Sequence, residues 1–534
     1  MKAVTALSAA FSSLLLLAGC ASDPQTAVPS STPSTPSTSA TPSAPSSPAA
    51  HILIASPANT PRPPFTFSAD DSAFLDLVQR GSWNWAMHAA NKNSGMVPDR
   101  DSQAYVSTAG VGFQLASFPI AVEHGWITRE EAAQRVDRIL TVLSNVKTTR
   151  KFGMYQHFID GDTGEMPKGS YEDVVSTIDS GLLFCGCIVA SSYFGGEIAQ
   201  KADALIAAAD WAAFVNKGDS KNAKEFERGF LSLGWKPRNL RSDPVGEGSF
   251  LPYYWLDAGC EHRIVSFLAV AAPDPTHRAD ANLYYRLRRQ IGRDKSLGAA
   301  GKNQIIYFPW SGAIFTNQFS HLFMNYAAMG PDNPAAHGVE NRAQVDWWEN
   351  ARRTTNLHRA RAIAYGKKFP KTGFGENAWG LTASDCTNGY QVSGAFPDLD
   401  EDAMTGARLM YDFSWYRPGD DFGDSSIAPY GAGMSILFEP KAAIAALRNY
   451  KQIAAQSDGV LKNVWADPTT GGHGFADAFN MEKDWVGKDH LAIDQLPMLI
   501  AIENARTGLV WRLFHQHPVV QAGMARLGLE TNRR

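Results

Sequence analysis

Residues 174–193 read VVSTIDSGLLFCGCIVASSY, and residues 197–215 read EIAQKADALIAAADWAAFV. The first stretch is apolar on almost every side of a helix, whereas the second carries its apolar residues mainly on one face. A helix that is apolar all round is buried, and an amphipathic helix covers it. The two stretches therefore predict an inner helix followed by an outer helix.

The same alternation runs through the rest of the chain. Amphipathic helices are also predicted at 72–89, 128–146, 346–365, 440–455 and 491–514, and apolar ones at 106–122, 257–271, 313–328 and 425–437. About a dozen helices in alternating positions predict an all-α (α/α)6 barrel, with short β segments in loops near residues 305–310 and 471–475. An irregular α-solenoid is the alternative, but no repeat at a fixed period supports it.

The N-terminus has the composition of an export signal. An apolar run ends in LAGC at residues 17–20, which resembles the lipobox of a bacterial lipoprotein. We expect residues 1–19 to be removed and Cys20 to carry lipid. Ala21 and Ser22 are typical of outer-membrane sorting in a Gram-negative cell, so the predicted location is the bacterial envelope, on its periplasmic or surface face. An ordinary secretory signal is the alternative.

Two regions of different composition follow the signal. Residues 20–64 are rich in Ser, Thr, Pro and Ala, with almost no charge, and such a segment cannot bury a core. We expect it to act as an extended tether. Residues 65–534 contain no second low-complexity linker, so we expect one large domain there.

Charge and cysteine content exclude several classes of function. The net charge is −4 and no basic cluster is present, so nothing indicates a nucleic-acid partner. The five cysteines are too few for a disulfide framework, and Cys185 and Cys187 lie in an apolar run typical of buried packing. No HExxH, paired CxxC, P-loop, GxSxG or Rossmann glycine pattern occurs in the required context, so no metal or cofactor is expected.

Three stretches place carboxylates or amides among aromatic residues and glycines. They read YYWLDAGCEHRIVSF at 253–267, PWSGAIF at 309–315 and GFGENAWGLTASD at 373–385. Aromatic faces can stack on sugar rings, and carboxylates can exchange protons with a glycosidic bond as it breaks. The combination predicts a carbohydrate site of the kind found in glycan-cleaving enzymes.

Three carboxylates are the predicted catalytic residues. Glu261 is the predicted general acid, because an apolar helix around it would raise its pKa; a buried ion pair with Arg263 or another cation is the alternative. Asp179 is the first candidate for the base, since an aspartate inside a predicted helix requires an explanation; a cap or kink is the alternative. Asp385 is the second candidate, with turn capping as its alternative.

Ten further residues are predicted to contact substrate. For any single large aromatic residue, packing in the core is the more common role, and for Asp173 the alternative is an exposed first-turn acid. The polar candidates are Asp173, Arg263, Gln318, His321 and Glu376, and the aromatic candidates are Trp255, Trp310, Trp379, Tyr390 and Tyr430.

A set of motifs in one order extends this prediction. They are VSTIDSG (175–181), LDAGCEHRIVSF (256–267), PWSGAIFTNQFSH (309–321), GFGENAWGLTASD (373–385), SSIAPYGAGMSI (425–436), GGHGFADAFN (471–480) and AIDQLPMLIAIENARTGLVW (492–511). The set resembles the glycoamylase-like domain group, which includes the endo-β-1,2-glucanases of glycoside hydrolase family 144 and the cyclisation domain of cyclic β-1,2-glucan synthases. The resemblance implies an (α/α)6 fold and action on β-linked glucan, with β-1,2-glucan first, and it places Glu261 at the acid position.

The leading prediction is an inverting endo-β-1,2-glucanase. Glu261 would protonate the leaving oxygen, and Asp179 or Asp385 would activate water from across a wide gap, about 6.5–9.5 Å between the two carboxyls. The alternatives are a retaining transglycosylase and a non-catalytic glycan-binding lipoprotein. A polysaccharide lyase would place Tyr, His and Arg around a uronate, and the acid-rich motifs argue against it.

Overall fold

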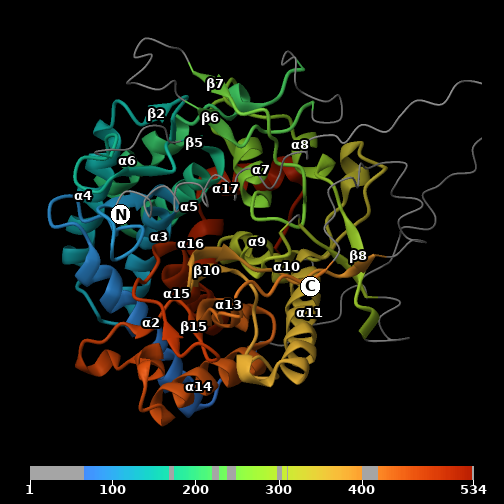
Figure 1. The fold of residues 1–534 in the computed structure, drawn as a ribbon. Coiled ribbons are helices and arrows are strands. Elements are labelled where there is room, and N and C mark those ends of the chain that lie inside the picture. Colours follow the sequence, from blue (N-terminus) through green and yellow to red (C-terminus); the bar gives the residue numbers. More distant parts are fainter. Residues whose placement is uncertain are drawn as a thin grey trace, which may run out of the picture.

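Two rings of helices, one inside the other, make up most of the molecule (Figure 1). The computed structural model describes residues 65–167, 174–218, 228–236, 248–296, 304–309, 311–399 and 419–531. Cys20, Asp173 and Trp310, for which the sequence predicted roles, lie outside the described residues.

The inner ring consists of six of the described helices, and nearly all their residues are buried. α3 packs on α5, α5 on α7, α9 on α13 and α13 on α15. α15 then packs against α3, so the last inner helix (red) lies beside the first (blue) in Figure 1. This closure rules out a solenoid and confirms the predicted (α/α)6 barrel. The inner helices are α3 (Thr108–Glu123), α5 (Thr177–Phe194), α7 (Arg263–Ala271), α9 (Ile314–Gln318), α13 (Pro429–Met434) and α15 (Ala492–Arg506).

The outer helices cover the inner ring. α2 packs on α15, α4 on α3, α6 on α5, α17 on α7, α11 on α9 and α14 on α13. These helices are α2 (Ala69–Ala89), α4 (Arg129–Asn145), α6 (Gly196–Ala207), α11 (Trp347–Lys368), α14 (Pro440–Gln456) and α17 (Pro518–Leu527). Shorter helices are α8 (Asn282–Arg286), α10 (Tyr326–Met329), α16 (Leu509–His515), η2 (Trp211–Phe214), η5 (Phe319–Leu322), η6 (Pro334–His337), η7 (Pro370–Thr372), η8 (Ser435–Leu437), η9 (Val460–Val464) and η10 (Pro468–Thr470).

Short antiparallel strands occupy the loops between the helices. The predicted β segments near 305–310 and 471–475 are confirmed as β9 and β14. The strands are β1 (Tyr105–Ser107) with β4 (Phe158–Asp160), β2 (Arg150–Lys151) with β3 (Met154–Tyr155), β5 (Val175–Ser176) with β6 (Gly234–Lys236) and β7 (Ser249–Phe250), β8 (Ile291–Arg293) with β9 (Ile305–Tyr307) and β12 (Asp398–Leu399), β10 (Ala383–Cys386) with β11 (Gly389–Val392), β13 (Trp465–Ala466) with β14 (Gly474–Phe475), and β15 (Phe479–Asn480) with β16 (Trp485–Val486).

Local sequence accounts for the helix boundaries and for the burial of each ring. The Glu131 amide donates to Thr128 Oγ1 at 3.1 Å, which caps the start of α4 as predicted. Pro440 opens α14 because a first-turn residue has no intrahelical acceptor for its N–H. Among the described helices, α5 alone is long and apolar enough to cross a membrane. Its burial inside the ring explains that composition.

Glycines allow α3 and α5 to approach closely. A Cβ added at Gly186 would collide with the carbonyl oxygen of Gly112, and one added at Gly112 would collide with the backbone of Leu182. The two backbones are therefore in contact here, which no larger residue at these positions would allow.

Several predicted helices differ from the structure. The helix predicted as amphipathic at 491–514 is divided into α15 and α16, and α15 belongs to the inner ring, with most of its residues buried. The helix predicted at 425–437 begins only at Pro429 and ends as the 3-10 turn η8. The helix predicted at 257–271 begins only at Arg263, because Asp257 and Ala258 are bound to another segment: Asp257 pairs with Arg288 Nη2 at 2.9 Å, and the Ala258 amide donates to the Arg288 carbonyl at 2.7 Å. The helix predicted at 313–328 is divided into α9, η5 and α10. The apolar composition correctly indicated burial, but it did not show where the helices break.

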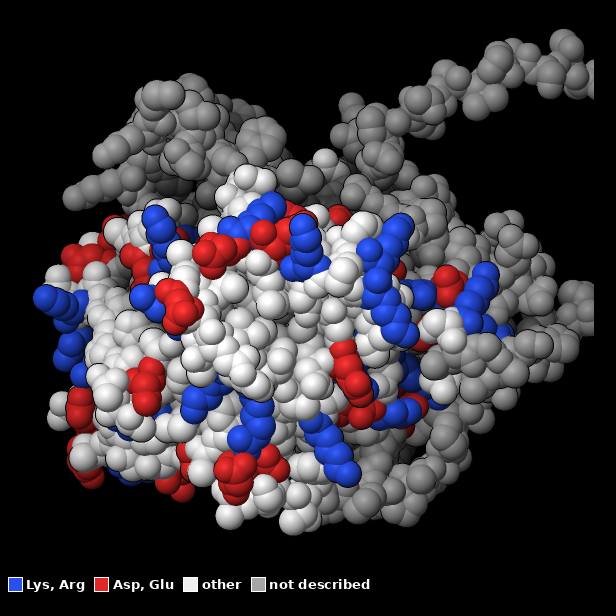
Figure 2. All heavy atoms as spheres, turned by 60° about the horizontal axis from the view of Figure 1, so that its bottom comes forward, with Lys and Arg blue, Asp and Glu red and all other residues white. Residues whose placement is uncertain are grey.

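The molecular surface on the side where α14 lies carries charges of both signs. Figure 2 shows Lys and Arg side chains interspersed with Asp and Glu side chains on this face. Interspersed charges make no large field of one sign, so this face does not steer a strongly charged polymer.

Candidate active site

A pocket opens at one end of the barrel, where the inner helices begin. Ala109, Phe315 and Tyr430 line it from the first turns of α3, α9 and α13. Asp179 and Asp494 come from the first turns of α5 and α15. The pocket holds about 610 Å³ of space, part of it open to solvent. The ring thus gathers at one place residues that are far apart in the sequence.

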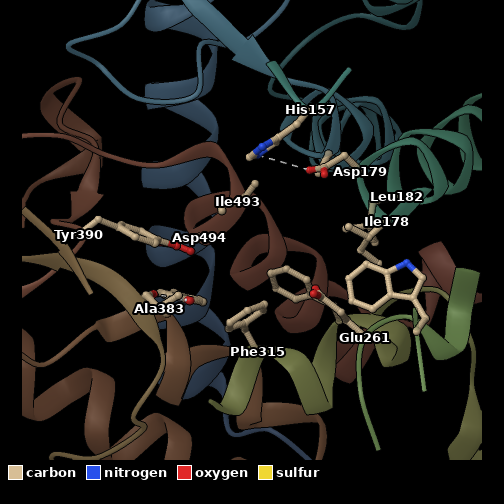
Figure 3. A pocket seen from close by; sticks show the side chains of 14 residues that line it. His157, Ile178, Asp179, Leu182, Glu261, Phe315, Ala383, Tyr390, Ile493 and Asp494 are labelled. Carbon is tan, nitrogen blue, oxygen red and sulfur yellow. Dashed lines mark hydrogen bonds and ion pairs between the residues drawn. The ribbon is translucent and has the colours of Figure 1, made fainter. Parts of the chain in front are cut away.

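Glu261 lies on one side of the pocket, in the turn before α7 rather than inside a helix (Figure 3). Burial, and then the charge of Asp179, raises the pKa of Glu261 to about 8. The carboxyl is consequently protonated at neutral pH, which is the form that a general acid requires. The carboxylate of Asp179 must be near, because its charge is felt at Glu261.

Arg263 does not neutralise Glu261. Its guanidinium is buried and donates to the Ala258 carbonyl at 2.6 Å and to Ser320 Oγ at 2.8 Å, with His321 Nε2 3.2 Å away. Among the described residues, the Arg263 guanidinium forms no ion pair with Glu261. The buried ion pair that was the alternative for Glu261 is therefore not present.

Asp179 is held at the start of α5 by its neighbours. Ser176 is the N-cap of α5, and its hydroxyl both accepts from the Asp179 amide at 3.2 Å and donates to Asp179 Oδ2 at 2.5 Å. On the other side, His157 Nε2 lies 3.7 Å from Asp179 Oδ1 (Figure 3). Asp179 is thus a first-turn residue rather than a helix-interior one, and its carboxylate is fixed with one edge toward the pocket.

Three aspartates interact with one another on the opposite side of the pocket. Asp494 lines the pocket across from Glu261 (Figure 3). The buried Asp477 carboxyl interacts with Asp494 and accepts a hydrogen bond from the Asp385 amide. Burial and the charge of Asp477 raise the pKa of Asp494 well above its usual range. Burial and the same charge raise the pKa of Asp385 to about 7, although Arg100 opposes this shift. Asp385 and Asp494 therefore hold a proton more tightly than an exposed aspartate does.

Arg100 connects this group to the pocket. Its Nη1 donates to Asp385 Oδ1 at 2.9 Å, and the Asp385 amide donates to Asp477 Oδ2 at 2.9 Å. The guanidinium also lies 5.6 Å from the centre of the Tyr390 ring, which lines the pocket. Asp385 itself is not on the pocket wall.

Three of the predicted aromatic residues line the pocket: Trp255, Tyr390 and Tyr430. The Trp255 indole N–H donates to Thr177 Oγ1 at 2.8 Å, which fixes the ring. The Tyr430 hydroxyl donates to the Ala383 carbonyl at 2.6 Å. These rings give the pocket apolar surfaces on which a sugar ring could stack.

Five predicted binding residues do not reach the pocket. Arg263, Gln318 and His321 are buried within the barrel, where the Gln318 amide donates to Ser435 Oγ at 2.9 Å. Trp379 is also buried, and its backbone amide donates to the Tyr450 hydroxyl at 3.2 Å. Glu376 is exposed in a turn. The sequence indicated residue types suited to sugar binding but could not separate pocket residues from core residues.

His157, Asp494 and Asp477 were not predicted to belong to the site. Asp494 and Asp477 lie inside the motifs AIDQLPM and GGHGFADAFN. A first-turn aspartate at the start of a strongly apolar helix was the available signal for Asp494, as it was for Asp179. His157 had no comparable signal, because it lies in a loop before β4. No group of three His, Cys, Asp or Glu residues in the described ranges could hold a metal ion.

Comparison with known proteins identifies the family. A family model described as "Putative glucoamylase", named Glycoamylase, matches residues 252–518, which is half of the chain. The chain belongs to this family. The match confirms the glycoamylase-like group that the ordered motifs indicated.

Several relatives share the fold across most of the chain. The exo β-1,2-glucooligosaccharide sophorohydrolase of Parabacteroides distasonis is 27% identical over 489 residues, covering 86% of this chain, and the chain spans only 58% of that relative's length. A β-1,2-glucanase structure from the same organism has a TM-score of 0.66 at 24% identity, over 86% of this chain and 60% of the other. An endo-β-1,2-glucanase structure from Chitinophaga pinensis, in complex with sophorotriose and glucose, has a TM-score of 0.64 at 22% identity, over 88% of this chain and all 100% of the other. At these identities the two structures establish a common fold.

Proposed function

We propose that this protein is a glycoside hydrolase that cleaves β-1,2-glucan, with Glu261 as its general acid. The observation that carries the proposal is the protonated carboxyl of Glu261 on the wall of a pocket that also presents Asp179, Trp255 and two tyrosines. Glycoside hydrolysis requires one carboxyl that is protonated and a second, ionisable carboxyl near it, and aromatic rings beside them can bind the sugar. The sophorohydrolase and the glucanases named above support β-1,2-glucan as the substrate.

In the proposed mechanism Glu261 donates its proton to the glycosidic oxygen as the bond to the leaving sugar breaks. Asp179 accepts a proton from the water that attacks the anomeric carbon from the opposite side, so the configuration inverts. Asp179 is preferred to Asp385 as the base because it lines the pocket, whereas Asp385 lies outside the wall and is bound to Arg100.

Asp494 has a different role in this mechanism. Burial and the charge of Asp477 raise the pKa of Asp494, which favours its protonated form, and a protonated carboxyl is a hydrogen-bond donor as well as an acceptor. We assign it to binding a sugar hydroxyl across from Glu261. Retaining transglycosylation, in which a carboxylate attacks the sugar directly, is the competing chemistry for the same residues.

Product analysis of the purified full chain tests the substrate and the mode of action. Linear β-1,2-, β-1,3- and β-1,4-glucans are incubated with the protein, and the products are sized. We expect only the β-1,2-glucan to be cleaved. The endo action predicted from the sequence would release products of a range of sizes. Release of sophorose alone would show exo action. NMR of fresh products should show the α-anomer first, and a β-anomer first would indicate retention.

Paired variants test the acid. Glu261→Gln keeps the shape of the side chain but cannot donate the proton, so turnover should fall on the order of a hundredfold or more. Glu376→Gln is the matched control, because Glu376 is an exposed glutamate outside the pocket, and its turnover should be unchanged. Near-normal turnover of Glu261→Gln would refute the assignment. Glucan binding without cleavage by the unaltered chain would support the non-catalytic alternative.

The proposed cellular location rests on the N-terminal sequence alone. We infer that Cys20 carries lipid and that the segment from 20 to 64 tethers the barrel to the bacterial envelope, at the outer membrane. Such an anchor would keep the enzyme beside glucan at the membrane surface.

A further inference from the structure

A second cavity lies at the other end of the barrel, where the inner helices end. Asn504 and Arg506 line it from the last turn of α15, Leu437 from the end of η8, and Asn325 from the segment after η5. It holds about 1900 Å³ of space open in part to solvent, compared with about 610 Å³ by the same measure for the pocket of Glu261. Because the pocket of Glu261 lies at the helix starts, the two cavities are at opposite ends of the ring.

Aromatic rings form part of the wall of the second cavity. Trp348 and Trp511 line it and are partly exposed. The Trp348 indole N–H donates to the Leu437 carbonyl at 3.0 Å, and the Trp511 indole N–H donates to the His321 carbonyl at 2.7 Å. Both rings are therefore fixed by the protein, and ordering them would cost little when a ligand stacks against them.

The charged residues of the wall are all cations. Lys441, Arg506 and Arg512 line the cavity, and within the described part of the chain no aspartate or glutamate does. Arg506 is paired with Asp76 Oδ1 at 2.6 Å. Lys441 and Arg512 are exposed, and neither forms an ion pair with any described residue. The Arg512 guanidinium donates to the Thr507 carbonyl, which leaves its positive charge without a carboxylate partner among the described residues.

His515 also lines the second cavity, and it adds no positive charge near neutral pH. Burial lowers the pKa of His515 to about 4, and its Nε2 accepts from the Asn325 amide at 3.0 Å. The positive charge of the cavity near neutral pH therefore comes from lysine and arginine, which do not titrate in that range.

We propose that this cavity is a second binding site, for a sugar that carries an anionic group such as a carboxylate or phosphate. The sugar ring would stack on the fixed indoles, and the anionic group would bind Lys441 and Arg512. Among the described residues, no lysine or arginine lines the pocket of Glu261, so an anionic sugar would find no cationic partner there and the two sites differ in specificity. The proposal goes beyond the proposed hydrolase activity and does not depend on it.

Binding measurements on the full chain test the proposal. The probes are a glucuronosyl-glucose disaccharide and sophorose, which are similar in size and differ in charge. Titration calorimetry should show binding of the glucuronosyl probe that weakens as salt is added. The double variant Lys441→Glu/Arg512→Glu should weaken that binding at least tenfold. Lys367→Glu, which reverses an exposed charge elsewhere on α11, is the matched control and should bind normally.

Several outcomes would overturn the proposal. The first is equal binding of the two disaccharides outside the Glu261 pocket. The second is that the glucuronosyl probe does not bind. The third is that its binding is lost in Glu261→Gln and not in the double variant. Vesicles of anionic phospholipid form a further arm. If they bind through Lys441 and Arg512 while the disaccharide does not, the cavity is a membrane contact and not a sugar site. Because the double variant changes only exposed side chains, its folding is checked by an unaltered unfolding transition.

Discussion

Single residues at the pocket show how burial prepares a carboxyl for proton transfer. Glu261 lies among apolar and aromatic residues, and Arg263, its nearest cation in the sequence, is bound to Ala258 and Ser320 instead. Without a cationic partner the charged form is unfavourable, so the pKa rises to about 8. The same arrangement has a cost in stability, since the folded protein resists ionisation of this group.

Glu261→Gln should therefore increase the free energy of unfolding at about pH 8, by about 1–3 kcal/mol. The pKa of Glu261 rises from 4.5 to about 8 on folding, so between these values the folded chain holds a proton that the unfolded chain has released. The contribution of this proton to the free energy of unfolding is complete below pH 4.5 and is lost as the pH rises through about 8. Glutamine, which stays neutral, shows no such loss.

Urea unfolding of both proteins at about pH 5 and about pH 8 measures this effect. The advantage of the variant should grow between the two values. An advantage that is the same at both would mean that folding does not raise the pKa of Glu261.

At the scale of elements, the contact between α3 and α5 determines where Asp179 lies. α5 carries Asp179 in its first turn, and Gly112 and Gly186 allow the two helix backbones to touch. A shift of α5 would move the carboxylate relative to Glu261, which is on a different segment. The packing of the inner ring and the geometry of the proposed chemistry are therefore linked.

Gly186→Ala should destabilise the protein by about 2–4 kcal/mol, because the new methyl group would overlap the backbone of α3 and neither helix can yield easily. Gly375→Ala is the matched control: a Cβ there meets nothing within 4 Å, so its stability should change by less than about 0.5 kcal/mol. Thermal unfolding compares the two. If Gly186→Ala were as stable as the control, the close approach of the helices would be wrong.

At the scale of the whole molecule, one continuous core joins the first described helix to the last. Phe74 of α2, Leu499 of α15 and Leu527 of α17 belong to the same cluster of buried residues. Arg506 near the end of the chain is paired with Asp76 near its start at 2.6 Å. We therefore expect the described residues to unfold as one unit without the N-terminal segment.

Removal of residues 1–64 should leave a protein that unfolds in one transition and retains its specific activity on glucan. Broad, non-cooperative unfolding of the shortened chain would refute the boundary at 65.

In the full chain, Cys20→Ala should release the protein from bacterial membranes with its specific activity unchanged, as measured by fractionation and by assay of each fraction. Membrane retention of Cys20→Ala would refute the lipid anchor.

Periodicity along the chain was enough to predict the (α/α)6 barrel. Alternating apolar and amphipathic stretches indicated the two rings, and local signals such as the Thr128 cap and Pro440 located helix starts, because periodicity and capping depend on neighbours along the chain. The motifs also indicated Glu261. The sequence placed Glu261 inside a helix, whereas α7 begins only after it. The later start follows from the pairing of Asp257 with Arg288, a contact between residues distant in the sequence.

Which side chains meet in the pocket depends on contacts between distant parts of the chain. Asp494 faces Glu261, and His157 approaches Asp179, because ring closure brings the starts of the inner helices together. Trp379 and His321 have the composition expected of sugar-binding residues but are buried in the core. Residue type and spacing carry no information on which side of a helix end faces the axis of the ring. That orientation follows from long-range packing, which is a property of the whole barrel.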